Sequence, residues 1–527
     1  MRARAAVGHD EPVSESSVLH APRRGLARLV VLGRRGFGRP RRPGGVVWVL
    51  FAVVAAVYAV FAVTCYAQYR TAGYDLGIFD QAVRGYAHLR LPVATLKGDG
   101  YDVLGDHFDP IVALWAPLYW VWDDVRMLLV GQAVVVAAAV FPVHRLVARR
   151  TGEPWSTLLT AGFALGWPIQ TLVNFDVHEV AFAVPLLAWA VDALDRRSDR
   201  DLCVVAALLL LVREDMGLVV AVLGVIRLAR AGRRWLGAVL VVVGVTAFVV
   251  LTAVVMPHLA PAGSAVRLRQ QYPQLGAGPG GVLLGALRDP WHTLTLLVEP
   301  PVKVGTLLAL LVPVGFLALG SPYALLAVPM LAGRFLSDRP LTWQTGFHYD
   351  APIWAVVVLA AVDAFGRRPL RRVPGARHGP RALAALLVGV ALLGPWVGPP
   401  EVTRLFPLRR LLDGEAFAST AKARDLTAAL AVVPPDTCVV ADDYAADHLT
   451  HTNRVTVAGV SRHRQDFFVL DLAQTPSVGT PSARSTSSAL AEAAAQGFTE
   501  VARSGSIVVL RSPHYAGPAS DCTPDSP

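Results

Sequence analysis

Long runs of apolar residues dominate the pattern of the chain. Runs at 46–66, 236–256 and 382–397 are each close to the ~20 residues that a helix needs to cross a bilayer. Reading every such run as a span predicts about eleven crossings and an all-α polytopic membrane bundle. The predicted spans are 46–66, 125–143, 155–173, 180–194, 201–213, 216–229, 235–256, 302–320, 322–333, 351–365 and 382–399.

The pattern changes after residue 400. Short β-branched runs at 438–440, 455–457 and 507–510 are interspersed with helical stretches at 416–432 and 488–497, which predicts a small α/β domain. We therefore divide the chain into four parts. They are a disordered basic tail (1–44), a transmembrane domain (45–399), an α/β domain (400–515) and a disordered tail (516–527).

Composition supports the membrane assignment, and charge orients it. Only 17% of the residues are charged, against ~25% in soluble domains. The predicted segments on the side of the N-terminus carry more than twice as many Arg and Lys residues as those on the other side. The positive-inside rule then predicts a multi-pass plasma-membrane protein with a cytoplasmic N-terminus and an extracytoplasmic α/β domain. The net charge of +10 is thus an orientation signal, and we expect no nucleic-acid partner.

Cysteine spacing gives no zinc motif. Cys438 and Cys522 both fall in the predicted extracytoplasmic domain, a compartment that permits a disulfide. A disulfide and two separate thiols both fit the sequence.

The first predicted outer loop carries the candidate catalytic carboxylates. The apolar residues of 74–87 follow helical spacing, and Asp75 and Asp80 flank that apolar arc. This pattern predicts an amphipathic helix in the plane of the membrane interface. Either carboxylate is a candidate general base. The structural alternative is that Asp75 caps the helix and Asp80 is merely solvated.

A second cluster follows in the same loop. Asp106, His107 and Asp109 precede Pro110 and the apolar run 111–122, which is too short for an ordinary span and is predicted to be re-entrant or interfacial. Three titratable groups in four residues can bind a metal, orient a sugar hydroxyl or cap the next helix. The cofactor is therefore unknown, and a divalent cation is left open.

Further polar residues fall on the same predicted side of the membrane. Asp176 and Glu179 have the spacing of a capping box, and Glu214 and Asp215 fit a tight hairpin; these are the structural alternatives. Ionisable residues cost roughly 2.5–3.5 kcal/mol each at a helix centre, so their collection on one side favours function. The candidate donor- or acceptor-binding residues are Asp106, His107, Asp109, His178, Glu179, Arg213, Glu214, Asp215, Arg334, His348 and Tyr349.

Five motifs in order carry a family resemblance. They are YDLGIFDQ at 74–81, GDHFDP at 105–110, FDVHEVAFAVPLL at 175–187, REDMG at 213–217 and HY at 348–349. Over about residues 46–470 the chain resembles a bacterial family of polytopic membrane proteins known only as a domain of unknown function. That family in turn is similar to the GT-C glycosyltransferases, which place an essential Asp in the first extracytoplasmic loop and use polyprenyl-phosphate sugars.

The resemblance implies a GT-C-like fold and a membrane glycosyltransferase of the cell envelope. Its partners would be a polyprenyl-phosphate sugar donor and membrane lipid. Asp75 or Asp80 would be the general base, and Arg213, Arg334 or His348 would face the donor phosphate. The paired acidic form of the GT-C loop motif is absent, since Asp75 and Asp80 are five residues apart. A transporter or flippase, and a non-catalytic membrane scaffold, are the alternatives.

Overall fold

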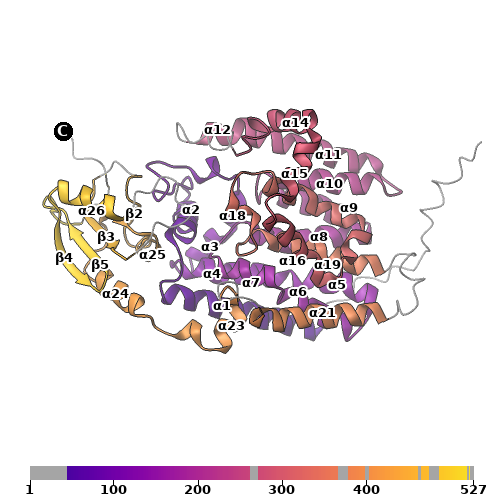
Figure 1. Cartoon of the computed structure of the whole chain (residues 1–527), viewed down its shortest axis with the longest axis horizontal. Coiled ribbons are helices and arrows are strands. Elements are labelled where there is room, and N and C mark those ends of the chain that lie inside the picture. The colour runs from indigo at the N-terminus through magenta and orange to yellow at the C-terminus, as the bar shows by residue number, and fades with distance from the viewer. Residues whose placement is uncertain are drawn as a thin grey trace, which may run out of the picture. The chain divides into compact units, whose positions relative to one another are not determined.

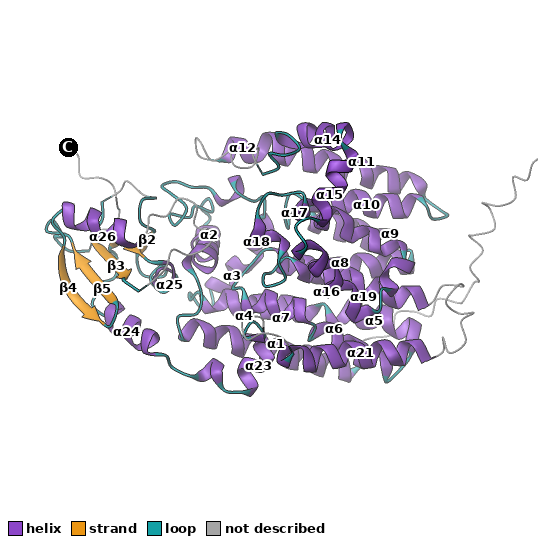
Figure 2. Ribbon diagram, in the orientation of Figure 1, coloured by secondary structure: helices purple, strands orange, loops and turns teal. Residues whose placement is uncertain are grey.

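The described part of the chain is mostly helical and carries one small sheet. A computed structural model describes residues 44–260, 271–365, 378–397, 403–460, 464–473, 486–518 and 522. The predicted basic tail 1–44 lies outside these residues except for Gly44, as does most of the predicted tail 516–527. Figure 2 shows most of the helices gathered in one region and the strands, with a few short helices, in another.

Four described helical segments are long and apolar enough to cross a membrane. They are Gly45–Ala67 (α1), Arg126–Thr151 (α4 and α5 together), Arg234–Leu259 (α11 to α12) and Gly379–Trp396 (α21 to η10). A fifth arises if the bent pair Pro290–Val298 and Val302–Val314 forms one span. Large apolar side chains such as Val49 on α1 and Val242 on α11 are exposed, as lipid-facing residues are. The chain is therefore a helical membrane protein with four or five such spans, and the number eleven stays a prediction.

Shorter helices account for most of the other predicted crossings, and two of the predicted spans are broken. The predicted span 302–320 leaves α-helical geometry at Val312–Val314 (η6) and continues as a 3₁₀ turn at Leu317–Gly320 (η7). The predicted span 322–333 begins as a 3₁₀ turn at Pro322–Leu326 (η8) before α17. Pro313 and Pro322 lie at these breaks, where proline removes a helical hydrogen bond.

The bundle is built around two largely buried helices. All residues of α19 except Phe365 are buried, and α8 is buried along most of its length. Helices α4, α5 and α9 pack on α8, and α5, α6, α7, α16, α17 and α21 pack on α19 (Figure 1). The helix bounds are α4 Arg126–Ala138, α5 Val140–Thr151, α6 Trp155–Ala164, α7 Trp167–Asn174, α8 Val180–Arg196, α9 Asp199–Leu209, α10 Met216–Leu228, α11 Arg234–Val250, α12 Met256–Leu259, α14 Gly278–Arg288, α15 Pro290–Val298, α16 Val302–Leu311, α17 Ala327–Phe335, α18 Pro340–Trp343, α19 Asp350–Phe365, α21 Gly379–Leu393 and α23 Pro407–Leu412.

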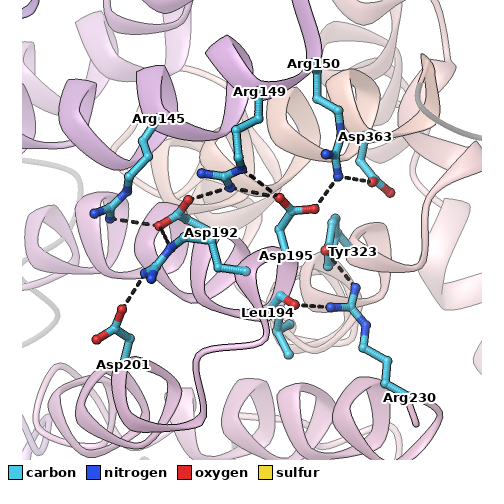
Figure 3. Close-up of polar contacts among 11 residues, drawn as sticks. Arg145, Arg149, Arg150, Asp192, Leu194, Asp195, Asp201, Arg230, Tyr323 and Asp363 are labelled. Carbon is cyan, nitrogen blue, oxygen red and sulfur yellow. Dashed lines mark hydrogen bonds and ion pairs between the residues drawn. The ribbon is translucent and has the colours of Figure 1, made fainter. Parts of the chain in front are cut away.

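A network of arginine–aspartate ion pairs joins α5, α8 and α19 at the predicted cytoplasmic end (Figure 3). Arg149 reaches Asp192 at 2.7 Å and Asp195 at 2.8 Å, and Arg150 pairs with Asp195 and, at 3.3 Å, with Asp363. Asp192 is fully buried. Removing one partner of a buried pair leaves an uncompensated charge, so this network ties the three helices together.

The predicted α/β domain contains a five-stranded mixed sheet in the order β2-β1-β3-β5-β4. The strand β1 pairs in parallel with β2 and β3, whereas β5 is antiparallel to β3 and β4. Cys438 and Cys522 form a disulfide, so the alternative of two thiols is wrong. The bounds are β1 Cys438–Ala441, β2 Arg454–Thr456, β3 Phe467–Asp471, β4 Thr499–Ser504, β5 Ile507–Arg511, α24 Ala421–Leu430, α25 Asp443–Ala446 and α26 Thr486–Ala495.

Candidate functional site

Asp75 lies on a short π-helical turn, η2 (Gly73–Gly77), between α1 and α2 (Ile78–Ala87). Its side chain is 33% exposed, and its Oδ1 is 3.5 Å from Nε2 of His178. Asp75 lies inside this turn, whose N-cap is Ala72, and the N-cap of α2 is Gly77, so the capping alternative for Asp75 is wrong. Glycines allow the turn to pass close to its neighbours: a Cβ added at Gly77 would lie 2.7 Å from Cδ1 of Leu96.

Asp80 has a different environment. It is fully buried, and its Oδ1 accepts hydrogen bonds from the Tyr119 hydroxyl at 2.7 Å and from Arg84 at 3.1 Å. The alternative of a solvated Asp80 is therefore wrong. The predicted helix 74–87 is also wrong over its first turn, because the wider π-turn changes the angular spacing of residues 73–77. As a result Asp75 and Asp80 do not lie as a matched pair at the two edges of one apolar face.

His178 and His348 form a stacked pair beside Asp75. Their ring centroids are 3.7 Å apart, and each residue is 6% exposed. Nδ1 of each ring has no hydrogen-bond partner among the described residues. Burial, followed by the positive potential of His178 and Arg213, holds the pKa of His348 well below its usual range, so this imidazole is neutral at pH 7.

The loop before α8 is held by Gln132 of α4. Its amide oxygen accepts from the backbone N–H of His178 at 2.8 Å, and its amide nitrogen donates to the carbonyl of Asp176. The carboxylate of Asp176 accepts from the backbone N–H of Ala72 at 2.9 Å, and Glu179 makes no capping bond to α8. The predicted capping box at Asp176 and Glu179 is therefore wrong, because the two carboxylates are used in tertiary contacts instead.

A second ionic group joins the first predicted outer loop to the turn before α10. Nδ1 of His107 is 3.0 Å from Glu214, whose other oxygen accepts from the backbone N–H of Phe108 at 3.1 Å. Burial lowers the pKa of His107, but the Glu214 carboxylate outweighs this effect and raises it to about 9. Burial and the charge of Glu179 raise the pKa of Asp109 well above its usual range. The imidazolium thus shares this site with a protonated Asp109.

The two candidate arginines are both paired with carboxylates. Arg213 contacts Asp215 through two nitrogens, at 2.9 and 2.7 Å, and Glu179 at 3.2 Å. Arg334 pairs with the buried Asp350 at 2.5 Å and also donates to two backbone carbonyls. Tyr349 lies next to this pair, with the Arg334 guanidinium 5.4 Å from its ring centroid. Both arginines therefore hold the site together.

The predicted site residues come together except at two positions. Asp80 is buried on the face of α2 that contacts Tyr119, and the Asp106 carboxylate pairs with Lys97 and not with the stacked histidines. Burial raises the pKa of Asp106, but the Lys97 ammonium outweighs this effect and lowers it to about 2. Among the described residues, no three His, Cys, Asp or Glu side chains are grouped so as to hold a metal ion.

Several residues of the site were missed from the sequence. Gln132 lies inside the predicted span 125–143, Asp350 directly precedes the predicted span 351–365, and Lys97 lies in the first predicted outer loop. None of the three was a predicted site residue, and only their tertiary contacts reveal them. The exposed Arg339 lies in the loop after α17, and its charge acts on both Asp106 and Tyr349. Asp443 and Asp447 come from the α/β domain, and the acidic run that contains them was the available signal.

An apolar groove begins one helical turn from the Arg334–Asp350 pair. It has a volume of about 470 Å³ and lies among α16, η7, η8, α17 and α19. Leu331 of α17 and Ile353 of α19 line it, and each is three residues from a member of the ion pair. The run 111–122 forms only short helices, η4 (Pro110–Trp115) and α3 (Ala116–Tyr119). The arrangement is thus a polar, histidine-bearing site next to an apolar groove.

Comparisons with known proteins place the chain in a family. Among curated proteins, no sequence matches this chain. Among solved structures, it is similar to the crystal structure of ArnT from Cupriavidus metallidurans bound to undecaprenyl phosphate, with a TM-score of 0.48 and 15% identity, over 90% of this chain and 99% of that chain. The model of a family described as predicted membrane protein (DUF2079) matches residues 66–499, which confirms the predicted resemblance to a membrane family of unknown function. The chain therefore belongs to the DUF2079 family of predicted membrane proteins.

Proposed function

We propose that the protein is a membrane glycosyltransferase of the GT-C type that transfers a sugar from a polyprenyl-phosphate donor to an extracytoplasmic acceptor. The observation that carries this proposal is a partly exposed carboxylate beside a buried imidazole pair, at a site that adjoins an apolar groove. Asp75 is 3.5 Å from His178, which stacks on His348. A prenyl phosphate is an amphiphile, and it needs both a polar site and an apolar one.

Asp75 acts as the general base in this proposal. It takes the proton of the acceptor hydroxyl while the sugar leaves the donor phosphate. Asp75 is preferred to Asp80 because it is 33% exposed, whereas Asp80 is fully buried under Tyr119 and Arg84. A base must reach the proton that it abstracts.

The departing phosphate is stabilised by donors that the fold leaves unused. Arg213 and Arg334 are committed to carboxylates, so we assign this role to the histidine pair together with the exposed Arg339. The free Nδ1 atoms of His178 and His348 can donate to phosphate oxygens. The neutral state of His348 at pH 7 provides a hydrogen-bond donor without adding a buried charge.

The disulfide Cys438–Cys522 supports an extracytoplasmic α/β domain, since disulfides persist in oxidising compartments. The direct contact of this domain with η2 supports, in turn, a position of Asp75 on the outer side of the membrane.

Mass spectrometry of the lipids that co-purify with the full-length protein tests the proposal. A bound polyprenyl phosphate that is lost in a His178→Ala/His348→Ala variant is the expected result. The matched control is Asp338→Asn, which changes an exposed residue of the same loop region and should keep the lipid. No polyprenyl lipid, combined with saturable uptake of a solute into vesicles, would contradict the proposal and favour the transporter.

A further inference from the structure

The α/β domain packs a short helix, α25, directly on the turn that carries Asp75. A Cβ added at Gly73 would lie 2.5 Å from Cβ of Ala446 and 3.1 Å from the carbonyl oxygen of Asp443. Real Cβ atoms do not approach this closely, so no side chain fits between the two segments at this point. The contact therefore depends on glycine at residue 73.

Three carboxylates hold the backbone that leads into Asp75. Asp447 accepts from the Thr71 hydroxyl, Asp176 from the Ala72 N–H at 2.9 Å, and Asp443 from the Tyr74 N–H at 2.8 Å. Two of these carboxylates come from α25 or the residue that follows it, and the third comes from the loop before α8. The three acceptors lie on two different sides of the segment, so residues 71–74 are held from both sides.

Aromatic stacking fixes the residues directly after α25 to the end of α1. The ring of His448 lies between those of Tyr66 and Tyr69, with centroid distances of 4.0 and 3.9 Å. Burial, mainly, lowers the pKa of His448 to about 3, so the ring between the two tyrosines is neutral at pH 7. The position of α25 is therefore set independently of its carboxylates.

We propose that α25 is a positioning element of the site, in which Asp443 and Asp447 hold residues 71–74 so that the Asp75 carboxylate faces His178. The functional meaning of this position rests on the glycosyltransferase proposed above. That α25 holds residues 71–74 does not depend on that function. Asp75 follows directly after Tyr74, whose N–H is bound by Asp443, so a change at α25 reaches the carboxylate through one residue of backbone.

The charges of the cluster agree with this role. Burial raises the pKa of Asp176 well above its usual range, with Asp75 as the largest charge contribution. Burial likewise raises the pKa of Asp447 to about 8. Both groups are therefore protonated at pH 7 and add little negative charge next to Asp75.

A cysteine at residue 75 reports on the position of the turn without any assay of transfer. We would use the purified full-length protein in detergent, carrying Asp75→Cys with Cys65→Ala and Cys203→Ser, and leave the disulfide intact. The probe is the rate of modification by a charged maleimide. Asp443→Ala should raise this rate roughly tenfold, because a backbone hydrogen bond to a carboxylate is lost. Asp443→Asn should leave it near the parent rate, because the amide oxygen still accepts the Tyr74 N–H.

A size exchange across the contact gives a second, independent test. Gly73→Ala should also raise the modification rate, and adding Ala446→Gly should reverse part of the increase, since it removes the Cβ that lies 2.5 Å away. A purely destabilising effect would not be reversed in this way. Modification rates within about twofold of the parent for both Asp443→Ala and Gly73→Ala, in protein that unfolds at the parent temperature, would overturn the positioning role.

Transfer kinetics separate this inference from the proposed function. With Asp75 present, Asp443→Ala should lower kcat roughly tenfold and leave KM unchanged, because the base is displaced while the donor site is intact. A higher KM with an unchanged kcat would overturn the positioning role. If the modification rates change as expected but no polyprenyl-phosphate sugar is a substrate, the positioning role of α25 is supported and the proposed function fails.

Discussion

At the scale of single residues, burial decides which carboxylate can react and which is structural. Asp75 and Asp80 are identical in chemistry and five residues apart, yet one is 33% exposed and the other is enclosed with Tyr119 and Arg84. Asp447 is a third case: it is fully buried, accepts from Thr71 through one oxygen, and has no hydrogen-bond partner for the other among the described residues. Its carboxyl is therefore expected to be protonated in the folded protein.

This protonation makes stability depend on pH. The fold raises the pKa of Asp447 from 3.8 to about 8, mainly through burial. The stabilising contribution of Asp447 is complete at a pH below the pKa of the unfolded state, and it is lost as the pH rises through the pKa of the folded state. Asp447→Asn cannot ionise, so between about pH 4 and about pH 8 its unfolding temperature should fall less than that of the parent, and above about pH 8 the difference should level off. Thermal unfolding at a series of pH values measures this. The exposed Asp436→Asn is the control, and equal pH dependence in parent and Asp447→Asn would contradict the assignment.

At the scale of elements, α10 and α11 pack closely against each other. Their contact is made by glycines, and a Cβ added at Gly244 would lie 2.4 Å from the carbonyl oxygen of Gly217. The same occurs one heptad away, where a Cβ at Gly224 would lie 2.6 Å from the carbonyl oxygen of Gly237. Small residues let two helix backbones approach closely in a membrane, and this pair therefore depends on them.

Gly244→Ala should consequently destabilise the protein. The new methyl group meets backbone atoms that cannot rotate away, so a cost of about 1–3 kcal/mol is expected. Gly389→Ala on α21 is the matched control, because nothing lies within 4 Å of its added Cβ; it should be neutral or slightly stabilising. Thermal unfolding in detergent compares the two variants, and an equal effect of both would show that α10 and α11 are not held by close packing.

The sequence was sufficient for the regular elements and insufficient for the irregular ones. Hydropathy located α1 and the segment from α11 to α12 to within a few residues of their observed bounds, because a bilayer span needs one long apolar run. The same rule failed at 302–333, where prolines divide the apolar sequence into short pieces. The π-turn at Asp75 and the packing of α25 against it were also missed, because both depend on contacts between residues more than 360 positions apart.

At the scale of the whole molecule, polar side chains separate into two groups at opposite ends of α8 and α19. The histidine-bearing site lies at their N-terminal ends, and the arginine–aspartate network at their C-terminal ends (Figure 3). The positive-inside rule assigns the network to the cytoplasm. The same rule predicted that the candidate site residues lie on the other side of the membrane, and most of them lie close together in the structure. Which of them pair with each other could not be predicted from charge alone.

Single-cysteine labelling of intact cells tests this orientation. Leu91→Cys lies in the first predicted outer loop and is 69% exposed as leucine, so a membrane-impermeant maleimide should label it from outside. Ala231→Cys lies in the exposed turn between α10 and α11 and should be labelled only after permeabilisation. The reverse pattern would place the histidine site in the cytoplasm and exclude an extracytoplasmic acceptor.

The central claim is that Asp75 is the base of a sugar transfer from polyprenyl phosphate, and one measurement tests it most directly. Transfer would be followed in proteoliposomes supplied with a panel of polyprenyl-phosphate hexoses and pentoses, for the parent, Asp75→Asn and the exposed control Asp338→Asn. Loss of general-base catalysis predicts that Asp75→Asn is slower by roughly 10²–10⁴-fold while Asp338→Asn keeps the parent rate. Transfer by Asp75→Asn at the parent rate would contradict the account.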